Sequence, residues 1–338
     1  MIRGDTSLAL VPSLRVFTFD QLRIFKQDTE VDLSKTKSRK ARDLLRYMIV
    51  YRRKSVPNEV LCEMFWPGMD YEFAKSNLHS TMYLVKRLLG SNVILSTDSG
   101  YIFDPNNEVW VDADEFERII ELAESKDISD EQKISLIEKA LDIYKGDFMK
   151  ENLYEDWVLP HRESYKEMYI NALVKLSTIY LAIGDISKAI EKAKTASRED
   201  PFNETACMTM MKAYTRWGKH TEAIKVYKRL CKVLKKELDI EPDGDLTKLY
   251  DDIVSGKYDQ RWIIVVESTA EQNLDINTVA KKIDSLLRNN DNIEVFSEQK
   301  LGIYLEGIPK STAENILSRI KEHLKDLADI RIKIDRAR

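Results

Sequence analysis

The sequence predicts a multidomain, mainly α-helical protein in which a helical solenoid separates two smaller units that contain β-strands. Three observations predict this class. The chain has 338 residues, enough for two or three domains. Only 11 residues are glycine while 33% are charged, a composition that favours helices. Apolar residues recur at helical spacing through the middle of the chain, whereas alternating apolar and polar residues occur near its two ends.

Charge is distributed unevenly along the chain. The net charge is −4, yet residues 1–105 carry 16 Lys and Arg against 12 Asp and Glu, so the front is +4 and the remainder is −8. A mildly basic front on an acidic body suits a module that faces nucleic acid joined to a module that faces protein.

Several function classes lack their sequence signatures. The three cysteines, Cys62, Cys207 and Cys231, have neither disulfide nor metal spacing and are expected to be reduced. There is no GxxxxGKS/T loop, GxSxG turn or HExxH helix, so we expect no enzymatic activity, no cofactor and no metal site. No apolar run reaches membrane-spanning length, which predicts a soluble, cytoplasmic protein without membrane contact. Residues 1–12 are expected to form a flexible tail.

Residues 13–108 are expected to form one domain of short strands, three helices and a hairpin. Alternation predicts strands at Leu14–Phe19, Leu22–Phe25 and Val31–Leu33. The first helix follows a basic segment, residues 35–42, and has an apolar stripe: Ala41, Leu44, Leu45, Met48 and Ile49. The second helix starts at Pro57 and is expected to bury Val60, Leu61, Met64 and Phe65. A hairpin with Gly100 in its turn joins residues 93–96 to 101–103.

The third helix, Tyr71–Gly90, carries the strongest functional signal. Four apolar residues form one stripe: Leu78, Met82, Val85 and Leu89. The opposite side holds donors, an aromatic ring and cations but no carboxylate: Ser76, His79, Ser80, Tyr83 and Arg87, with Lys75 and Lys86 at the margins. Such a face suits the major groove of DNA, and an ordinary surface helix is the alternative.

The predicted DNA contacts divide by chemistry. Cations are expected to neutralise phosphates: Arg39, Lys40, Lys75, Lys86 and Arg87. Neutral polar side chains on the third helix are expected to face base edges: Ser76, His79, Ser80 and Tyr83. Hairpin residues are expected to reach the minor groove or the backbone: Thr97, Ser99 and Tyr101.

The order of strands, three helices and a hairpin is that of a winged helix-turn-helix. The runs KARDLLRYMIVYRRKSVPNEVLCEMFWPG, AKSNLHSTMYLVKRLLG, STDSGYIFDP and WVDADEFE resemble the OmpR/PhoB-type DNA-binding domain of the Streptomyces antibiotic regulatory proteins (SARPs). The resemblance covers residues 14 to about 116. This family often has two or three arginines late in the recognition helix, where this chain has Tyr83 to Arg87. The resemblance implies that the loop Trp66–Tyr71 contacts RNA polymerase, with a core role for Trp66 as the alternative.

Residues 109–256 are expected to form the solenoid. Two segments repeat with a period of 34 residues: Tyr180, Gly184, Ala189 and Ile190 recur as Tyr214, Gly218, Ala223 and Ile224. This pattern resembles tetratricopeptide repeats (TPRs), in which small residues let paired helices approach closely. Pro201 stands where such a repeat ends its second helix, and Lys235 takes its place in the second copy, which predicts a longer helix there.

The same region resembles the bacterial transcriptional activation domain that accompanies the winged helix in SARPs. The segments DFMKENLYEDWVLPHRE and LDIEPDGDLTKLYDDI carry this resemblance. It implies that the domain mediates dimerisation and activation. A passive scaffold is the alternative.

Residues 259–338 are predicted to form a ferredoxin-like domain with the element order β-α-β-β-α-β. Such folds dimerise, pack or bind small ligands. Residues 301–307 and the helix after them are similar to the second half of a diguanylate cyclase domain. The glycines and the acidic pair of that family are missing, so a domain of this kind would be catalytically dead.

These observations predict a sequence-specific DNA-binding transcriptional activator that binds double-stranded DNA repeats as a homodimer and contacts RNA polymerase. The alternatives are a TPR-based interaction adaptor and a regulator that responds to a small molecule, such as a cyclic nucleotide, through its C-terminal domain.

Overall fold

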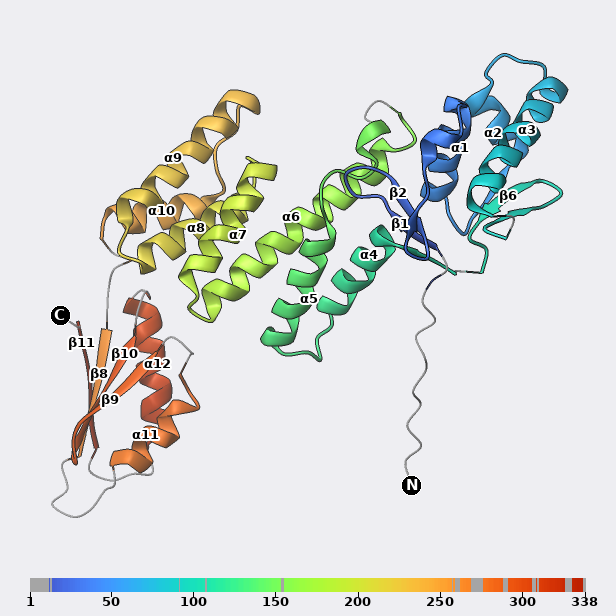
Figure 1. The fold of residues 1–338 in the computed structure, drawn as a ribbon. Coiled ribbons are helices and arrows are strands. Elements are labelled where there is room, and N and C mark those ends of the chain that lie inside the picture. The colour runs from blue at the N-terminus through green and yellow to red at the C-terminus, as the bar shows by residue number, and fades with distance from the viewer. Residues whose placement is uncertain are drawn as a thin grey trace, which may run out of the picture. The chain divides into compact units, whose positions relative to one another are not determined.

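A computed structural model describes residues 12, 14–90, 92–106, 108–152, 155–256, 258, 262–268, 276–287, 291–305, 308, 310–325 and 330–336. The predicted flexible tail lies outside these residues except at position 12. The chain is mainly helical and divides into two compact units, Met1–Tyr169 and Ile170–Arg338 (Figure 1). The predicted domain limits at residues 108 and 256 stay predictions.

The first unit begins with a four-stranded sheet in the order β3-β2-β1-β7. Its strands are β1 (Leu14–Phe17), β2 (Arg23–Lys26), β3 (Thr29–Glu30) and β7 (Val109–Val111). The predicted third strand at Val31–Leu33 is wrong. The chain turns at Gln27 and Asp28 so that Thr29 pairs with Lys26, and a 3-10 turn capped by Asp32 follows. Strand β7 pairs in parallel with β1 and was not predicted.

Three helices and a smaller sheet follow. The helices are α1 (Arg39–Val50), α2 (Asn58–Phe65) and α3 (Tyr71–Leu89), and the sheet order is β4 (Ser55–Pro57), β6 (Gly100–Phe103), β5 (Ile94–Ser96). The predicted stripe of α1 is buried, but Val60 and Met64 of α2 are each 43% exposed, contrary to prediction. Strand β4 pairs with β6 directly before α2 and so fixes where this short helix starts and which side it buries.

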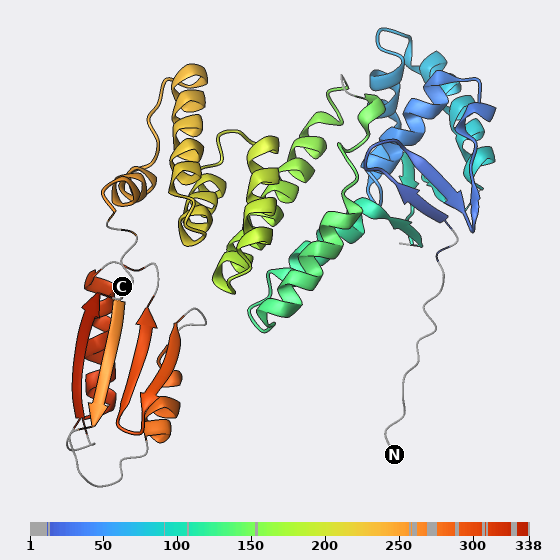
Figure 2. The same cartoon turned by 60° about the vertical axis from the view of Figure 1, so that its left-hand side comes forward.

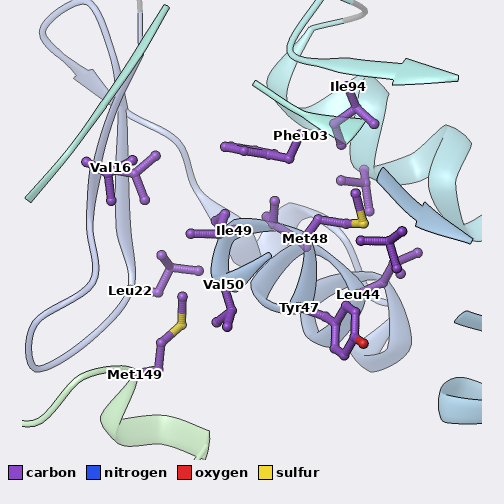
Figure 3. Close-up of a cluster of buried hydrophobic side chains, with 14 of the residues drawn as sticks. Val16, Leu22, Leu44, Tyr47, Met48, Ile49, Val50, Ile94, Phe103 and Met149 are labelled. Carbon is purple, nitrogen blue, oxygen red and sulfur yellow. The ribbon is translucent and has the colours of Figure 1, made fainter. Parts of the chain in front are cut away.

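Helix α1 lies between the two sheets of the first unit (Figure 3). Val16 and Leu22 from the β1–β2 region approach it on one side, and Ile94 and Phe103 from the hairpin approach it on the other. Met149, far along the chain, joins the same core. The hairpin, the helices and the first sheet therefore share one hydrophobic core.

That core extends into helices after the second strand group: α4 (Asp112–Ala123), α5 (Asp130–Ile143), the 3-10 turn η2 (Lys150–Asn152) and the start of α6 (Leu159–Ala182). Phe19 packs edge to face on Phe116 and Tyr165, with both ring centroids at 5.5 Å. The Asp112 carboxylate accepts hydrogen bonds from the backbone N–H of Thr18 at 2.8 Å and from its hydroxyl at 2.6 Å. Burial raises the pKa of Asp112, and the hydrogen bonds from Thr18 oppose that rise.

The second unit contains the rest of α6 and the helices α7 (Ile186–Glu199), α8 (Glu204–Arg216), α9 (His220–Glu237) and α10 (Gly244–Val254). Gly184 and Gly218 lie in the two equivalent turns, with φ of 86° and 72°. Ala189 and Ala223 are both fully buried, as the predicted close helix packing requires. Helix α9 has 18 residues against 14 in α7, which confirms the prediction of a longer helix in the second repeat.

The C-terminal part of the second unit forms a sheet in the order β11-β8-β10-β9. Its elements are β8 (Trp262–Ser268), α11 (Ile276–Asp284), β9 (Asn292–Ser297), β10 (Lys300–Leu305), α12 (Lys310–His323) and β11 (Ile330–Arg336). Helices α11 and α12 lie on one side of the sheet (Figures 1 and 2). The predicted element order is found, and the ferredoxin-like assignment stays a prediction.

Candidate nucleic-acid interface

Helix α3 is held at both ends and along one side. The Asp70 carboxylate accepts hydrogen bonds from the backbone N–H of Glu72 and Phe73, at 3.1 and 3.5 Å. Gly90 ends the helix with a φ of 108°, which favours glycine. The predicted apolar stripe is buried: Leu78, Met82, Val85 and Leu89. The orientation of the helix is therefore fixed, and its opposite side is turned to solvent.

The solvent side of α3 displays five of the predicted contact residues. All five are exposed: Ser76, His79, Ser80, Tyr83 and Arg87. The Ser80 hydroxyl donates to the Ser76 carbonyl at 3.1 Å, so its oxygen lone pairs remain available to a ligand. No Asp or Glu occurs after Glu72 in this helix, so no carboxylate repels a phosphate backbone there.

Lys86 and Tyr101 connect α3 to the hairpin. The Lys86 ammonium donates to the Ser96 hydroxyl at 2.7 Å and lies 5.5 Å from the centroid of the Tyr101 ring. Burial lowers the pKa of Lys86 and raises that of Tyr101. Tyr101 is only 7% exposed and its ring lies 6.5 Å from the imidazole of His79. This burial conflicts with the predicted contact of Tyr101 with DNA. The Tyr101 ring instead packs beside the imidazole of His79.

The hairpin turn is stabilised by its own groups. The Thr97 hydroxyl accepts from the Gly100 N–H at 3.0 Å, and the Thr97 N–H donates to the Gly100 carbonyl at 2.8 Å. A Cβ on Gly100 would lie 2.0 Å from the Val56 carbonyl oxygen, so only glycine permits the pairing of β6 with β4. Ser99 is exposed at the tip and Thr97 is half-buried.

The remaining predicted cations have partners within the first unit. Lys40 donates to the Phe65 carbonyl and lies 4.9 Å from the Trp66 ring, which is buried as a core anchor. Lys75 lies 5.6 Å from the Tyr71 ring, and Arg39 is 3.5 Å from the Asp43 carboxylate while remaining exposed.

Arg87 differs from these cations because it has no hydrogen-bond or ion-pair partner among the described residues. It lines a groove of about 910 Å³ between the end of α3 and the β2–β3 hairpin. Three lysines that were not predicted as contacts line the same groove: Lys26, Lys35 and Lys37. The basic segment 35–42 contained the signal for two of them.

No group of three or more His, Cys, Asp or Glu side chains in the part of the chain that the structure describes is arranged to hold a metal ion. None of the described helices has both the length and the apolar character needed to cross a membrane.

Residues 111–254, which hold α4 to α10, match the family model of the bacterial transcriptional activator domain (BTAD). No curated protein matches the chain in sequence. The fold of the chain resembles that of Mycobacterium tuberculosis EmbR, solved in complex with a low-affinity phosphopeptide. This likeness covers 87% of this chain and 78% of EmbR, with 19% identity and a TM-score of 0.62.

A second solved structure is the TPR-containing C-terminal domain of a Plasmodium falciparum FK506-binding protein. It matches 43% of this chain and 89% of that domain, with 20% identity and a TM-score of 0.33, a value too low to support an argument. The BTAD match therefore concerns the helical middle of the chain, and the likeness to EmbR shows a shared fold.

Proposed function

We propose that the chain is a sequence-specific DNA-binding transcriptional activator of the SARP type, which binds double-stranded promoter repeats as a homodimer and contacts RNA polymerase. The observation that carries the proposal is the exposed, carboxylate-free face of α3 beside the β5–β6 hairpin. A single helix with this face and an adjacent hairpin has the shape that the major groove accepts. The BTAD match on the same chain supports a role in transcription rather than in another kind of DNA transaction.

Base reading is assigned to the middle of α3. The hydroxyls of Ser76 and Ser80, the imidazole of His79 and the phenol of Tyr83 all donate or accept hydrogen bonds. None of them offers the bidentate fork with which arginine recognises guanine, so we expect direct and water-mediated contacts of moderate discrimination.

Phosphate contacts are assigned to the exposed cations, above all Arg87, which has no partner within the described part of the chain. Arg39, which is exposed, and Lys75, which is half-buried, are further candidates, and Ser99 and Thr97 of the hairpin are assigned contacts with the minor groove or the backbone. Lys86 and Tyr101 receive a different role, because the contacts of Lys86 with Ser96 and Tyr101 brace the reading helix. Lys40 instead links α1 to the end of α2 through the Phe65 carbonyl. Fixing a helix in this way is what allows four side chains to read neighbouring base pairs.

The polymerase contact is assigned to the α2–α3 region. Met69 in the loop is 45% exposed, and Val60 and Met64 of α2 are exposed beside it in sequence. Apolar side chains at the surface are the part of this region that a protein partner could cover. A homodimer would place two such reading helices on half-sites about one helical turn apart, ~10–10.5 bp.

The purified protein is first used to protect and isolate the genomic DNA fragments that it binds. Gel-shift titrations on these fragments then test the assigned DNA contacts. Arg87→Ala should weaken binding to all sites and reduce the salt slope by about one, because it removes one phosphate contact. His79→Ala should change the ranking of sites, with a cost of roughly 1–3 kcal/mol at the preferred one. Lys126→Ala, an exposed cation between α4 and α5, serves as the matched control and should change neither quantity.

The result also discriminates between functions. If the chain binds no fragment above its non-specific affinity, the proposal is wrong and an adaptor role through the helical repeats becomes the better reading. Equal effects of Arg87→Ala and His79→Ala on every site would refute the division between phosphate and base contacts.

A further inference from the structure

The C-terminal sheet leaves one face without a helix. Helices α11 and α12 cover the side that carries Ile264, Val266 and Leu301, all fully buried (Figures 1 and 2). The other side carries Ile263 and Val265 on the interior strand β8, which are only half-buried. An antiparallel sheet often leaves one face to solvent, but such a face is usually polar, whereas Ile263 and Val265 are apolar.

An aromatic side chain, that of Phe296, lies on this open face beside Gly302. A Cβ on Gly302 would lie 2.6 Å from two ring carbons of Phe296, so the Phe296 ring rests on the space that glycine leaves. Phe296 occupies the irregularity where the β9–β10 register shifts, and it is 43% exposed. Its ring meets the Tyr304 ring edge to face with centroids 6.5 Å apart. The centre of the face is therefore apolar, with an aromatic pair beside Gly302.

Opposite charges stand at the two edges of the same row. The strand registers align Lys333 on β11 with Val265, Val265 with Gly302, and Gly302 with Glu294 on β9. Lys333 is exposed and has no ion-pair partner in the described part of the chain. Glu294 is exposed too, and it accepts a hydrogen bond from the Tyr304 hydroxyl. One row thus runs from a cation, across small and apolar residues, to an anion.

This row is complementary to itself. A second copy turned over by a two-fold axis parallel to the strands would place its β11 edge above the β9 edge of the first. Lys333 of each copy would then meet Glu294 of the other, and Val265 would face Gly302 and the Phe296 ring. An axis perpendicular to the strands would instead place Lys333 against Lys333, which like-charge repulsion disfavours.

We propose that this open sheet face, built around Val265, Gly302 and Phe296, is the homodimer interface of the protein. The proposal deepens the homodimer of the proposed function by naming its surface. With strands about 4.8 Å apart and a rise of ~3.4 Å per residue, the face covers roughly 400 Å² per copy. The total of roughly 800 Å² lies below the ~1,200 Å² of stable specific interfaces, so the dimer should be weak and should dissociate on dilution.

Sedimentation velocity of the full chain without DNA tests this interface. The wild type should shift from monomer to dimer as its concentration rises. Lys333→Glu and Glu294→Lys should each give monomers, because each places like charges together twice in a two-fold dimer. An equimolar mixture of the two variants should form a heterodimer, since both of its edge pairs are then opposite in sign. The double variant K333E/E294K should regain the homodimer.

Controls separate an interface effect from a folding effect. The changed residues are exposed, so circular dichroism and thermal unfolding of each variant should match the wild type. Lys232→Glu, an exposed cation on α9, is the matched control and should leave the dimer unchanged. Val265→Glu should abolish the dimer even at high concentration.

Three results would overturn the proposal: a wild-type chain that stays monomeric, a dimer that ignores these charge changes, or two variants that fail to associate when mixed. None of these results depends on DNA. A failed interface is therefore distinguishable from a failed DNA assignment, which the Arg87→Ala gel shift reports.

Discussion

The two four-stranded sheets of this chain differ in how charged side chains are arranged on their outer faces. On the first sheet, Phe17 packs edge to face on Phe25 and Trp110, with centroids 5.6 and 5.3 Å apart. Arg23 lies 5.0 Å from the Phe25 centroid and pairs with Glu30 at 2.9 Å. The aromatic surface is thus covered by a cation whose charge is balanced within the same sheet.

The C-terminal sheet pairs Lys300 with Glu267 at 3.7 Å, but it leaves another cation and anion far apart. Lys333 and Glu294 lie on opposite edge strands, three strand spacings apart in one row, and Phe296 is left uncovered between them. A face that balances its charges within one chain is a completed surface. In the proposed dimer, a second copy brings each of these two charges opposite its counterpart, and four predictions test this contrast.

The largest effect is expected where the first sheet is tied to the helices behind it. Asp112→Asn replaces one acceptor oxygen by a donor that faces the Thr18 N–H and hydroxyl. Loss of a charge-assisted hydrogen bond in a buried site should cost about 3 kcal/mol of unfolding free energy. Urea unfolding measures the total, and hydrogen exchange measures its location.

The location decides whether the two sheets are independent. Peptides from residues 14–26 should lose protection, whereas peptides from residues 262–268 should keep it. Equal loss of protection in both sets of peptides would mean that the two sheets unfold as one cooperative unit and are not independent.

Gly302→Ala should have the next largest effect, and on association rather than on folding. The new methyl group would displace the Phe296 ring, which is the movable end of a side chain, and would lie 3.1 Å from the Ile263 methyl. We expect the dimer dissociation constant to rise by on the order of tenfold, or about 1.4 kcal/mol. Thermal unfolding should change little, because alanine also reduces the entropy of the unfolded chain. An unchanged dissociation constant would remove Phe296 from the interface.

Neutralising one cation on each sheet gives a smaller and more direct contrast. Arg23→Gln removes a cation that is balanced by Glu30 in its own sheet, so the oligomeric state should not change. Lys333→Gln should raise the dissociation constant by roughly two- to tenfold, because the two-fold dimer loses two exposed pairs of a few tenths of a kcal/mol each. Sedimentation at several concentrations measures both variants, and a response to Arg23→Gln alone would reverse the assignment of the two faces.

The sequence predicts those elements that a local periodic pattern determines. The stripes of α1 and α3 follow from the 3.6-residue period, and the longer α9 follows from the replacement of Pro201 by Lys235 in the repeat. Strands β4 and β7 were not predicted, because a strand of three residues is too short to show a periodic pattern. Each is defined by a distant partner, Val56 by Tyr101 and Val109 by Leu14.

The same distinction between local pattern and distant partners applies to the residues of the candidate site. Helix geometry alone placed His79 and Arg87 on one face, and both are exposed there. It could not show that Tyr101 is buried or that Lys86 is bonded to Ser96, because both depend on how the hairpin folds back on α3. Whether these residues touch DNA stays a prediction.

The smallest effect concerns pH and should appear in the first unit alone. His161 in α6 packs against the rings of Tyr51 and Phe148, with centroids 5.7 and 6.4 Å away. Burial lowers the pKa of His161 from 6.5, and the charges of Arg52 and Lys54 lower it further. The unfolded chain therefore binds this proton more readily than the folded chain does.

The sign of the pH dependence follows from that difference. The stabilising contribution of neutral His161 is complete above pH 6.5 and is lost as the pH falls through the lowered pKa of the folded state. Acidification from pH 7 should thus reduce the protection of residues 14–26 against hydrogen exchange while residues 262–268 keep theirs. His161→Gln should remove part of this dependence, because glutamine has no proton to bind. Equal acid sensitivity in the variant would assign the effect to other groups.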